Sequence, residues 1–266
     1  MTNLFRHIRQ QLADDNQFLR YSRYAVGEIV LVVIGILIAL SINNYNDKRK
    51  DAAAEQLYYG RILNDLDLDK QLIAELLEKA DHRIANSKAL LLDLDSGTKD
   101  KHYLTNKFLE AIRNDAYIPR NTTFKDLSSS GNFRLLQDLE IKNSLIQFYS
   151  ELENKQAQMN QNRNKLVDQI FDLVGSSMEF GGLQEFDYVK RLLNQEIIQT
   201  LPQVDWTRDK SSESYQKFQM LLLMNIALAD REKQHLYAIK DMMEAPYSLL
   251  EKKCEKPSHQ QKFKKG

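Results

Sequence analysis

The sequence has few of the residues that mark several other classes of protein. A single cysteine excludes an internal disulfide framework and a metal site built from several cysteines. The 37 Lys and Arg residues are matched by 37 Asp and Glu, so the chain lacks the basic excess with which proteins bind nucleic acid through bulk electrostatics. Nine glycines and four prolines in 266 residues leave few interruptions to regular structure. With 42% hydrophobic and 28% charged residues, the composition predicts a folded, helix-rich chain and excludes wholesale disorder.

A long hydrophobic run near the N-terminus is the clearest feature that is present. Residues 25–42 read AVGEIVLVVIGILIALSI, and no side chain from Ile29 to Leu40 is polar. As a helix, this run would span roughly 27 Å at about 1.5 Å per residue, close to the ~30 Å hydrocarbon core of a bilayer. Its Ile, Leu and Val side chains favour insertion by about 4–7 kcal/mol as an upper limit. Glu28 lies near the end of the run and opposes insertion by less than the roughly 2.5–3.5 kcal/mol of a charge at mid-bilayer. We therefore predict a transmembrane helix over residues 25–42.

Two alternatives for this run remain open at the level of sequence. The first is the buried core helix of a soluble protein, although such helices rarely contain so long an apolar stretch. The second is a cleaved signal peptide, because Ala39-Leu40-Ser41 resembles a cleavage site between small residues. The 24 residues that precede the run are long for a signal peptide and carry a pattern of their own, so we favour an uncleaved signal-anchor.

The two ends of the run carry side chains that suit a membrane interface. Aromatic and charged side chains are favoured at the level of the headgroups, and those expected there are Arg20, Tyr21, Arg23, Tyr24, Glu28 and Tyr45. Inside the run, Gly35 and Ala39 are four residues apart and would permit close packing of two helices. The expected partners are therefore the lipid bilayer and either another protein or a second copy of the chain, paired through the transmembrane helix and the stalk that follows it.

The orientation does not follow from charge alone. Residues 1–24 are predicted to form an amphipathic juxtamembrane segment, because Leu4, Ile8 and Leu12 recur every four residues among arginines. Basic residues are equally frequent on both sides of the run. Long C-terminal domains are translocated largely regardless of charge, and export of the arginine-rich N-terminal segment would be unfavourable. We therefore expect a cytoplasmic N-terminus and a periplasmic C-terminal domain.

The residues of the anchor are more specific than those of a generic membrane helix. The run from Tyr24 to Asn46, with Phe5-Arg6-x-Ile8-Arg9 ahead of it, resembles the N-terminus of a Bacteroidota family of single-pass membrane proteins, the DUF6090 family. The stretch Thr123-Phe124-x-x-Leu127-Ser-Ser-Ser-Gly131-Asn132 is similar to a segment in the middle of that family's domain. The family usually has Gln in place of Ser41 and Trp in place of Tyr45. The resemblance implies a bacterial inner-membrane protein with a helical extramembrane domain, and it assigns no catalytic residue.

Residues 43–250 are predicted to form a helical extramembrane domain. Apolar residues at helical spacing from Tyr59 to Leu77 indicate that the membrane helix continues as a stalk, which Ser96-Gly97-Thr98 interrupts. No stretch has the period-two alternation of a strand. The pattern predicts an all-α, antiparallel bundle of four or five main helices and a disordered basic tail at 251–266. Further helices are expected at about 104–115, 138–177, 186–200 and 212–244, with a loop at 128–132 and with Pro246 beyond the last helix.

Few side chains in this domain suggest chemistry. Glu232 and His235 have the Glu-x-x-His spacing of di-iron bundles, but no second motif of that kind completes the ligand set. Asp65, Asp67 and Asp69 superficially resemble a calcium loop, yet they lie on a helical pattern and are expected on a solvated face. Cys254 is expected to be a spare thiol in the tail. We predict no catalytic, cofactor or metal residue.

Three functions are compatible with these features. The favoured one is a non-enzymatic, membrane-anchored protein whose periplasmic bundle binds a partner or ligand in an interaction or sensory role. The first alternative is a metal-binding bundle enzyme that uses Glu232 and His235. The second is a structural membrane spacer.

Overall fold

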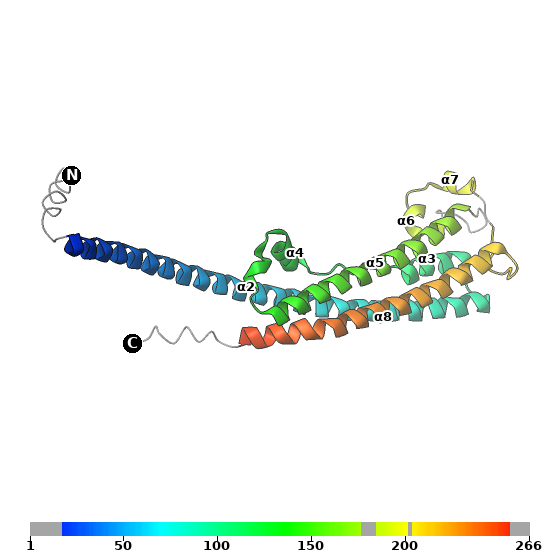
Figure 1. Cartoon of the computed structure of the whole chain (residues 1–266). Helices are drawn as coiled ribbons and strands as arrows, with labels where there is room; N and C mark the ends of the chain where they lie inside the picture. Colours follow the sequence, from blue (N-terminus) through cyan, green and yellow to red (C-terminus); the bar gives the residue numbers. More distant parts are fainter. Residues whose placement is uncertain (1–17, 177–184, 202–203, 256–266) are drawn as a thin grey trace, which may run out of the picture. The chain divides into compact units, whose positions relative to one another are not determined.

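The computed structural model describes residues 18–176, 185–201 and 204–255, and every regular element in these ranges is helical, which confirms the all-α class. The chain divides into two compact units, Met1–Leu57 and Tyr58–Gly266. The elements are α2 (Phe18–Ser96), α3 (Lys101–Ile112), α4 (Thr122–Ser129), the 3-10 helix η1 (Asn132–Leu135), α5 (Leu139–Ser176), α6 (Asp187–Lys190), α7 (Gln195–Gln199) and α8 (Glu213–Glu255) (Figure 1).

The first unit contributes the apolar part of α2. Among the described residues, α2 is the one helix long and apolar enough to cross a membrane, and no residue of its most apolar window is buried. The Ile, Leu and Val side chains from Ile29 to Ile42 are each 45–71% exposed. A continuous apolar surface of this kind is unfavourable in water. This exposure argues against the alternative of a buried core helix.

The helix α2 extends well beyond the apolar run, as the sequence predicts. It ends at Ser96, and Gly97 follows with a φ of +62°, the left-handed conformation that glycine adopts most readily after a helix. The amide of Gly97 donates to the carbonyl of Leu94. The predicted interruption at Ser96-Gly97-Thr98 is thereby confirmed.

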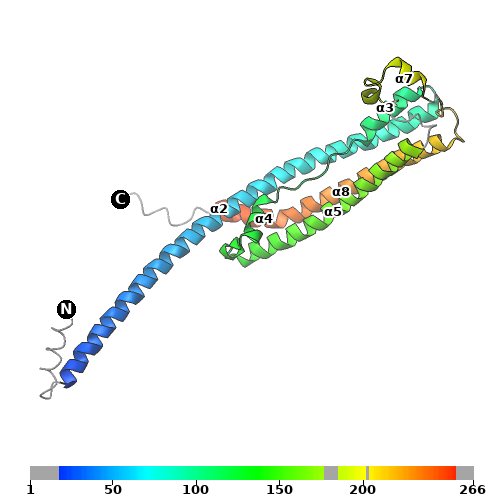
Figure 2. The same cartoon turned by 90° about the horizontal axis from the view of Figure 1, so that it is seen from above.

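In the second unit, four segments of the chain, called legs below, lie along one another: α2 from Tyr58 onward, α3 with residues 113–121, α5 and α8. In the second leg, α3 is followed by residues 113–121, which are not helical. Asp115 contacts Lys79, whereas Tyr117 contacts Asp69, so this segment runs antiparallel to α2. The next leg, α5, is parallel to α2, and α8 returns alongside α5 (Figure 2). The described part of the bundle therefore has three long helices and one shorter helix, with half of the second leg extended.

Two apolar clusters hold the four legs together. The first cluster contains Tyr59, Ile62, Leu66, Ile73, Leu76, Tyr117, Leu127, Leu136, Ile141, Leu145, Phe148, Tyr149, Leu152, Met159, Leu236, Ile239, Met243 and Leu250. The second cluster contains Leu90, Leu94, Leu104, Phe108, Leu166, Phe186, Trp206, Tyr215, Phe218, Leu221 and Leu222. Both clusters draw on α2, α5 and α8. Because the clusters are separate, the side chains between them form a distinct layer of the bundle.

The structure differs from the sequence prediction at the end of α8. Pro246 lies inside this helix, which continues to Glu255 and therefore includes Cys254. A proline removes one helical hydrogen bond and disfavours the helix by about 3 kcal/mol. The side chains of Met243 and Leu250 on either side are fully buried, and their packing offsets this loss. The predicted disordered tail thus begins no earlier than residue 256, and residues 256–266 lie outside the described part.

Other helix boundaries also differ. Helix α3 begins at Lys101 because Asp100 caps it, accepting from the amide of Tyr103 at 2.7 Å. The region 186–200 forms α6 and α7 rather than one helix, since Asn194 starts a new helix as an N-cap. The predicted loop at 128–132 is the end of α4 followed by Gly131, whose φ of +72° turns the chain into η1. Most of the predicted juxtamembrane segment 1–24 lies outside the described residues.

Candidate functional site

The membrane-interface residues predicted from sequence lie at the two ends of the apolar run on α2 or just outside it. Tyr24 is 77% exposed and Tyr45 67% exposed, and Glu28 is also exposed. A Cβ added at Gly35 would meet nothing within 4 Å, and Ala39 is exposed, so both would be accessible to another helix. The side chains of Arg20, Tyr21 and Arg23 lie outside the described part, although their backbone belongs to α2.

A layer of buried polar side chains separates the two apolar clusters. Arg83 and Ser87 on α2 face Asn225 and Glu232 on α8. Asn225 donates through Nδ2 to Ser87 Oγ and to the carbonyl of Ala111, both at 2.9 Å. These bonds satisfy an amide that is only 1% exposed. The polar layer therefore joins α2, α3 and α8 by specific hydrogen bonds.

An ion pair lies at the centre of the polar layer. Arg83 Nη2 and Glu232 Oε2 are 2.5 Å apart, and the two side chains are 7% and 12% exposed. Asn114 Nδ2 donates to the same oxygen at 3.5 Å. Arg83 Nε is buried and has no acceptor in the described part of the chain. Removing charges from water is unfavourable by several kcal/mol per ion, so such a pair contributes little net stability.

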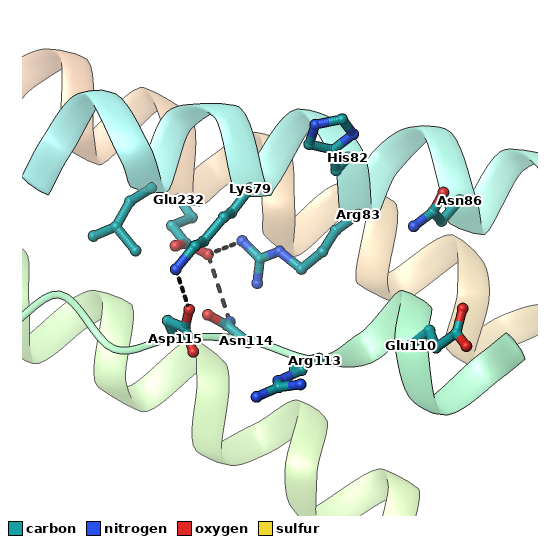
Figure 3. Close-up of a pocket in the computed structure, with 10 residues that line it drawn as sticks. Lys79, His82, Arg83, Asn86, Glu110, Arg113, Asn114, Asp115 and Glu232 are labelled. Atoms are coloured by element: carbon teal, nitrogen blue, oxygen red, sulfur yellow. Dashed lines mark hydrogen bonds and ion pairs between the residues drawn. The ribbon is translucent and has the colours of Figure 1, made fainter. Parts of the chain in front are cut away.

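A cavity of about 300 Å³ opens beside this pair (Figure 3). One wall is α2, and the facing wall is the end of α3 with the start of the extended segment. The lining residues are Leu76, Lys79, His82, Arg83, Asn86, Glu110, Arg113, Asn114, Asp115 and Glu232. This volume is at the lower end of the range typical of small-molecule sites. Six of these ten residues are Lys, Arg, Asp or Glu, three basic and three acidic.

The carboxylates of the cavity are already bonded. Lys79 Nζ is 2.6 Å from Asp115 Oδ2, and this hydrogen bond raises the pKa of Lys79 and lowers that of Asp115. Glu110 accepts from Lys107 at 2.6 Å, and Glu232 accepts from Arg83. By contrast, the exposed side chain of Arg113 forms no ion pair or hydrogen bond with the described residues. The same holds for the amide of Asn86.

Glu232 and His235 occupy different surroundings despite their spacing. The Glu232 carboxylate is engaged by Arg83, whereas His235 is 8% exposed and its buried Nε2 has no partner in the described chain. Burial lowers the pKa of His235, and the charges of Lys155 and Arg231 act in the same direction. Within the described ranges, no group of three His, Cys, Asp or Glu side chains is arranged to hold a metal ion. The structure therefore does not bring Glu232 and His235 together with a third ligand.

The environment of Asp69 differs most clearly from the one that the sequence pattern predicts. Asp69 was expected on a solvated face of the stalk, but its exposed fraction is zero. It accepts from the amide of Arg120 at 2.9 Å and from Tyr117 Oη at 3.3 Å. Burial raises its pKa to about 6, although both hydrogen bonds oppose the shift. The extended segment covers this face of α2, and helical periodicity alone does not reveal such a cover.

The tyrosines near Asp69 are also perturbed. Burial and the charge of Asp69 raise the pKa of Tyr117, and burial with the charges of Asp65 and Asp69 raises that of Tyr149. The hydroxyl of Tyr149 is buried without a partner in the described chain, and its ring stacks on Phe124 at 4.0 Å between centroids. This cluster fastens the extended segment and α5 to α2. None of its residues lines the cavity beside Arg83, so we assign it a structural role.

Comparisons with known proteins add one result. Searches of the curated proteins and of the solved structures found no match. A family model described as Family of unknown function (DUF6090) matches residues 28–180. The matched range includes most of the apolar run, all of α3, α4 and η1, and the α2 and α3 walls of the cavity. Because the match covers more than half of the chain, the protein belongs to the DUF6090 family.

Proposed function

We propose that this protein is a single-pass membrane protein whose helical domain is a non-enzymatic binding module with an interaction or sensory role. In this proposal, residues 25–42 form an uncleaved anchor in the cytoplasmic membrane of a bacterium. The N-terminal segment lies in the cytoplasm and the helical domain in the periplasm. The exposed apolar surface of α2 supports the anchor. The arginines of the N-terminal segment support the orientation.

The observation that carries the binding function is the polar layer with its cavity. A bundle of this size is stabilised by its apolar clusters, and a buried ion pair is often matched or exceeded in stability by apolar residues of similar volume. The layer therefore adds little to stability, and it places charged and amide groups around a space of about 300 Å³. Convergent polar groups at a preformed cavity are the usual arrangement of a ligand site.

The proposal includes partners beyond the bilayer. They are another membrane protein or a second copy of the chain, paired through the transmembrane helix and the stalk, to which the helical domain would pass a signal. Exposed apolar side chains on the short helices α6 and α7 and in the turn between them, namely Tyr188, Ile197 and Leu192, support a protein partner at this end of the domain.

A cavity-blocking variant tests the binding function without assuming the ligand's chemistry. Asn86 lines the cavity, is exposed and makes no hydrogen bond within the described chain, so Asn86→Trp should fill the cavity and leave the fold intact. Asn164→Trp, at an exposed position of α5 outside the cavity, is the matched control. Full-length protein in nanodiscs would be titrated with amino acids, sugars, nucleotides, oxyanions and divalent cations while the unfolding temperature is measured. We expect one class to give a saturable increase that Asn86→Trp abolishes and Asn164→Trp preserves. If no class gives an increase that depends on Asn86, the binding function at this cavity is refuted.

A further inference from the structure

The hydrogen-bonding groups of the cavity are unevenly satisfied. Each of its three carboxylates, on Glu110, Asp115 and Glu232, accepts a hydrogen bond from a lysine or arginine. Three donors of the cavity have no acceptor among the residues that the structure describes: the guanidinium of Arg113, the Nε of Arg83 and the amide of Asn86. Lys79 and Arg83 each pair with a carboxylate, whereas Arg113 forms no ion pair with the described residues. The cavity therefore contains one cation and several donors that a ligand could engage.

We infer that the cavity binds a small oxyanion, carrying a phosphate or carboxylate group, which accepts hydrogen bonds from these unbonded donors. This inference rests on the proposed binding function and names the chemical class of the ligand. Guanidinium groups bind planar or tetrahedral oxyanions through two or more parallel hydrogen bonds. Arg113 stands at the C-terminal end of α3, on the wall opposite Arg83, so an anion between them contacts both walls.

The arrangement of donors on α2 agrees with this assignment. Lys79, Arg83 and Asn86 are spaced by four and three residues, which places them on one face of a helix. In Figure 3, the side chains of Lys79 and Arg83 extend from α2 toward the segment that carries Asn114 and Asp115. A volume of about 300 Å³ accommodates a phosphate or a short dicarboxylate.

A cationic ligand fits these groups less well. It would share Asp115 with Lys79 or Glu232 with Arg83, and it would be repelled by the charge of Arg113, which forms no ion pair with the described residues. Breaking the second pair would leave a nearly buried guanidinium uncompensated, which is strongly unfavourable. An anion requires no such sharing, because Arg113 forms no ion pair or hydrogen bond with the described residues and its charge acts on Asp115 only at longer range.

The test compares two exposed arginines. Arg113→Gln removes the unpaired cation of the cavity. Arg134→Gln removes an exposed arginine on η1, outside the cavity, that likewise has no ion pair within the described residues. Full-length protein in phosphatidylcholine nanodiscs would be titrated calorimetrically with inorganic phosphate and with succinate, at pH 7.5 and at an ionic strength held constant with sodium chloride. Far-UV circular dichroism would verify that both variants remain folded.

We expect saturable binding of at least one of the two anions. Arg113→Gln should weaken it by at least about tenfold, the effect of losing a charge-assisted hydrogen bond, whereas Arg134→Gln should leave it unchanged. The assignment is overturned if neither anion binds saturably or if both variants weaken binding equally. If another ligand class then binds in a manner that Asn86→Trp abolishes, only the oxyanion class fails. If no class does so, the binding function fails as well.

Discussion

Glu232→Ala would leave the Arg83 guanidinium without the carboxylate that now neutralises it. Arg83 is only 7% exposed at its side chain, so water that enters through the cavity would replace the lost partner only in part. Removing one partner of a buried ion pair typically destabilises a protein by about 3–5 kcal/mol. We expect a loss of about 3 kcal/mol, because the cavity admits some water to Arg83, while Arg83 Nε already has no acceptor in the described chain and the mutation also removes the acceptor of Asn114.

The double variant Arg83→Met with Glu232→Leu separates the effect of the buried charges on stability from the effect of side-chain packing. Both charges are then absent and apolar side chains fill a similar volume, so the stability should equal that of the wild type within about 1–2 kcal/mol or exceed it. Urea unfolding of the detergent-solubilised protein can be followed by fluorescence, because Trp206 is the sole tryptophan and is buried in the second apolar cluster. The reasoning is refuted if Glu232→Ala loses less than about 1 kcal/mol, or if the double variant is as unstable as the single one.

Three further predictions concern the fold. Asp69 has a pKa raised from 3.8 to about 6 in the folded state, so its protonated form is favoured by folding and its contribution to stability is lost as the pH rises from about 4 to about 6. At about 1.4 kcal/mol per pKa unit, this loss is on the order of 3 kcal/mol. Urea unfolding should therefore show that the unfolding free energy of Asp69→Asn rises by that amount relative to the wild type between pH 4 and pH 7. A difference in unfolding free energy that does not depend on pH would contradict this prediction. Gly131→Ala should destabilise the protein by about 1–2 kcal/mol, because the φ of Gly131 is +72°. Gly60→Ala should stabilise it by about 0.5–1 kcal/mol, because Gly60 lies in the interior of α2 with open space around an added Cβ. Thermal unfolding in which both substitutions change the stability in the same direction would contradict these conformations. Lys101 Nζ donates to the carbonyl of Val204 at 2.6 Å and pairs with Glu185 at 3.1 Å. Limited proteolysis should therefore cleave the Lys101→Met variant between residues 186 and 204 faster than it cleaves the control variant Lys99→Met. Equal cleavage rates would show that Lys101 does not hold this segment in place.

Much of the fold follows from local sequence patterns. The stalk and the long helix α5 are predicted to within a few residues, because their apolar residues recur every three to four positions. The N-terminal ends of α3 and α7 are set by single capping residues, Asp100 and Asn194. The spacing of apolar residues does not reveal where such a cap lies. Pro246 shows the opposite case, in which burial of neighbouring side chains overrides a local helix breaker.

The candidate site was less accessible from sequence than the fold. The spacing of Glu232 and His235 is that of a di-iron motif, but the side chain that Glu232 binds is Arg83, 149 positions away along the chain. Arg113 and Asn86 carry no motif, and their role depends on a cavity that forms only when the extended segment lies against α2. Asp69 was assigned to a solvated face because nothing local indicates that Tyr117 and Arg120 cover it. Contacts between distant segments decide each of these cases.

The anchor is the part of the account on which the placement of the domain depends, and alkaline carbonate extraction of membranes followed by intact mass spectrometry tests it most directly. We predict that the protein stays in the membrane pellet and that residues 25–42 remain attached to the helical domain. A soluble protein, or one whose first residue is Ile42 after cleavage behind Ser41, would contradict the account.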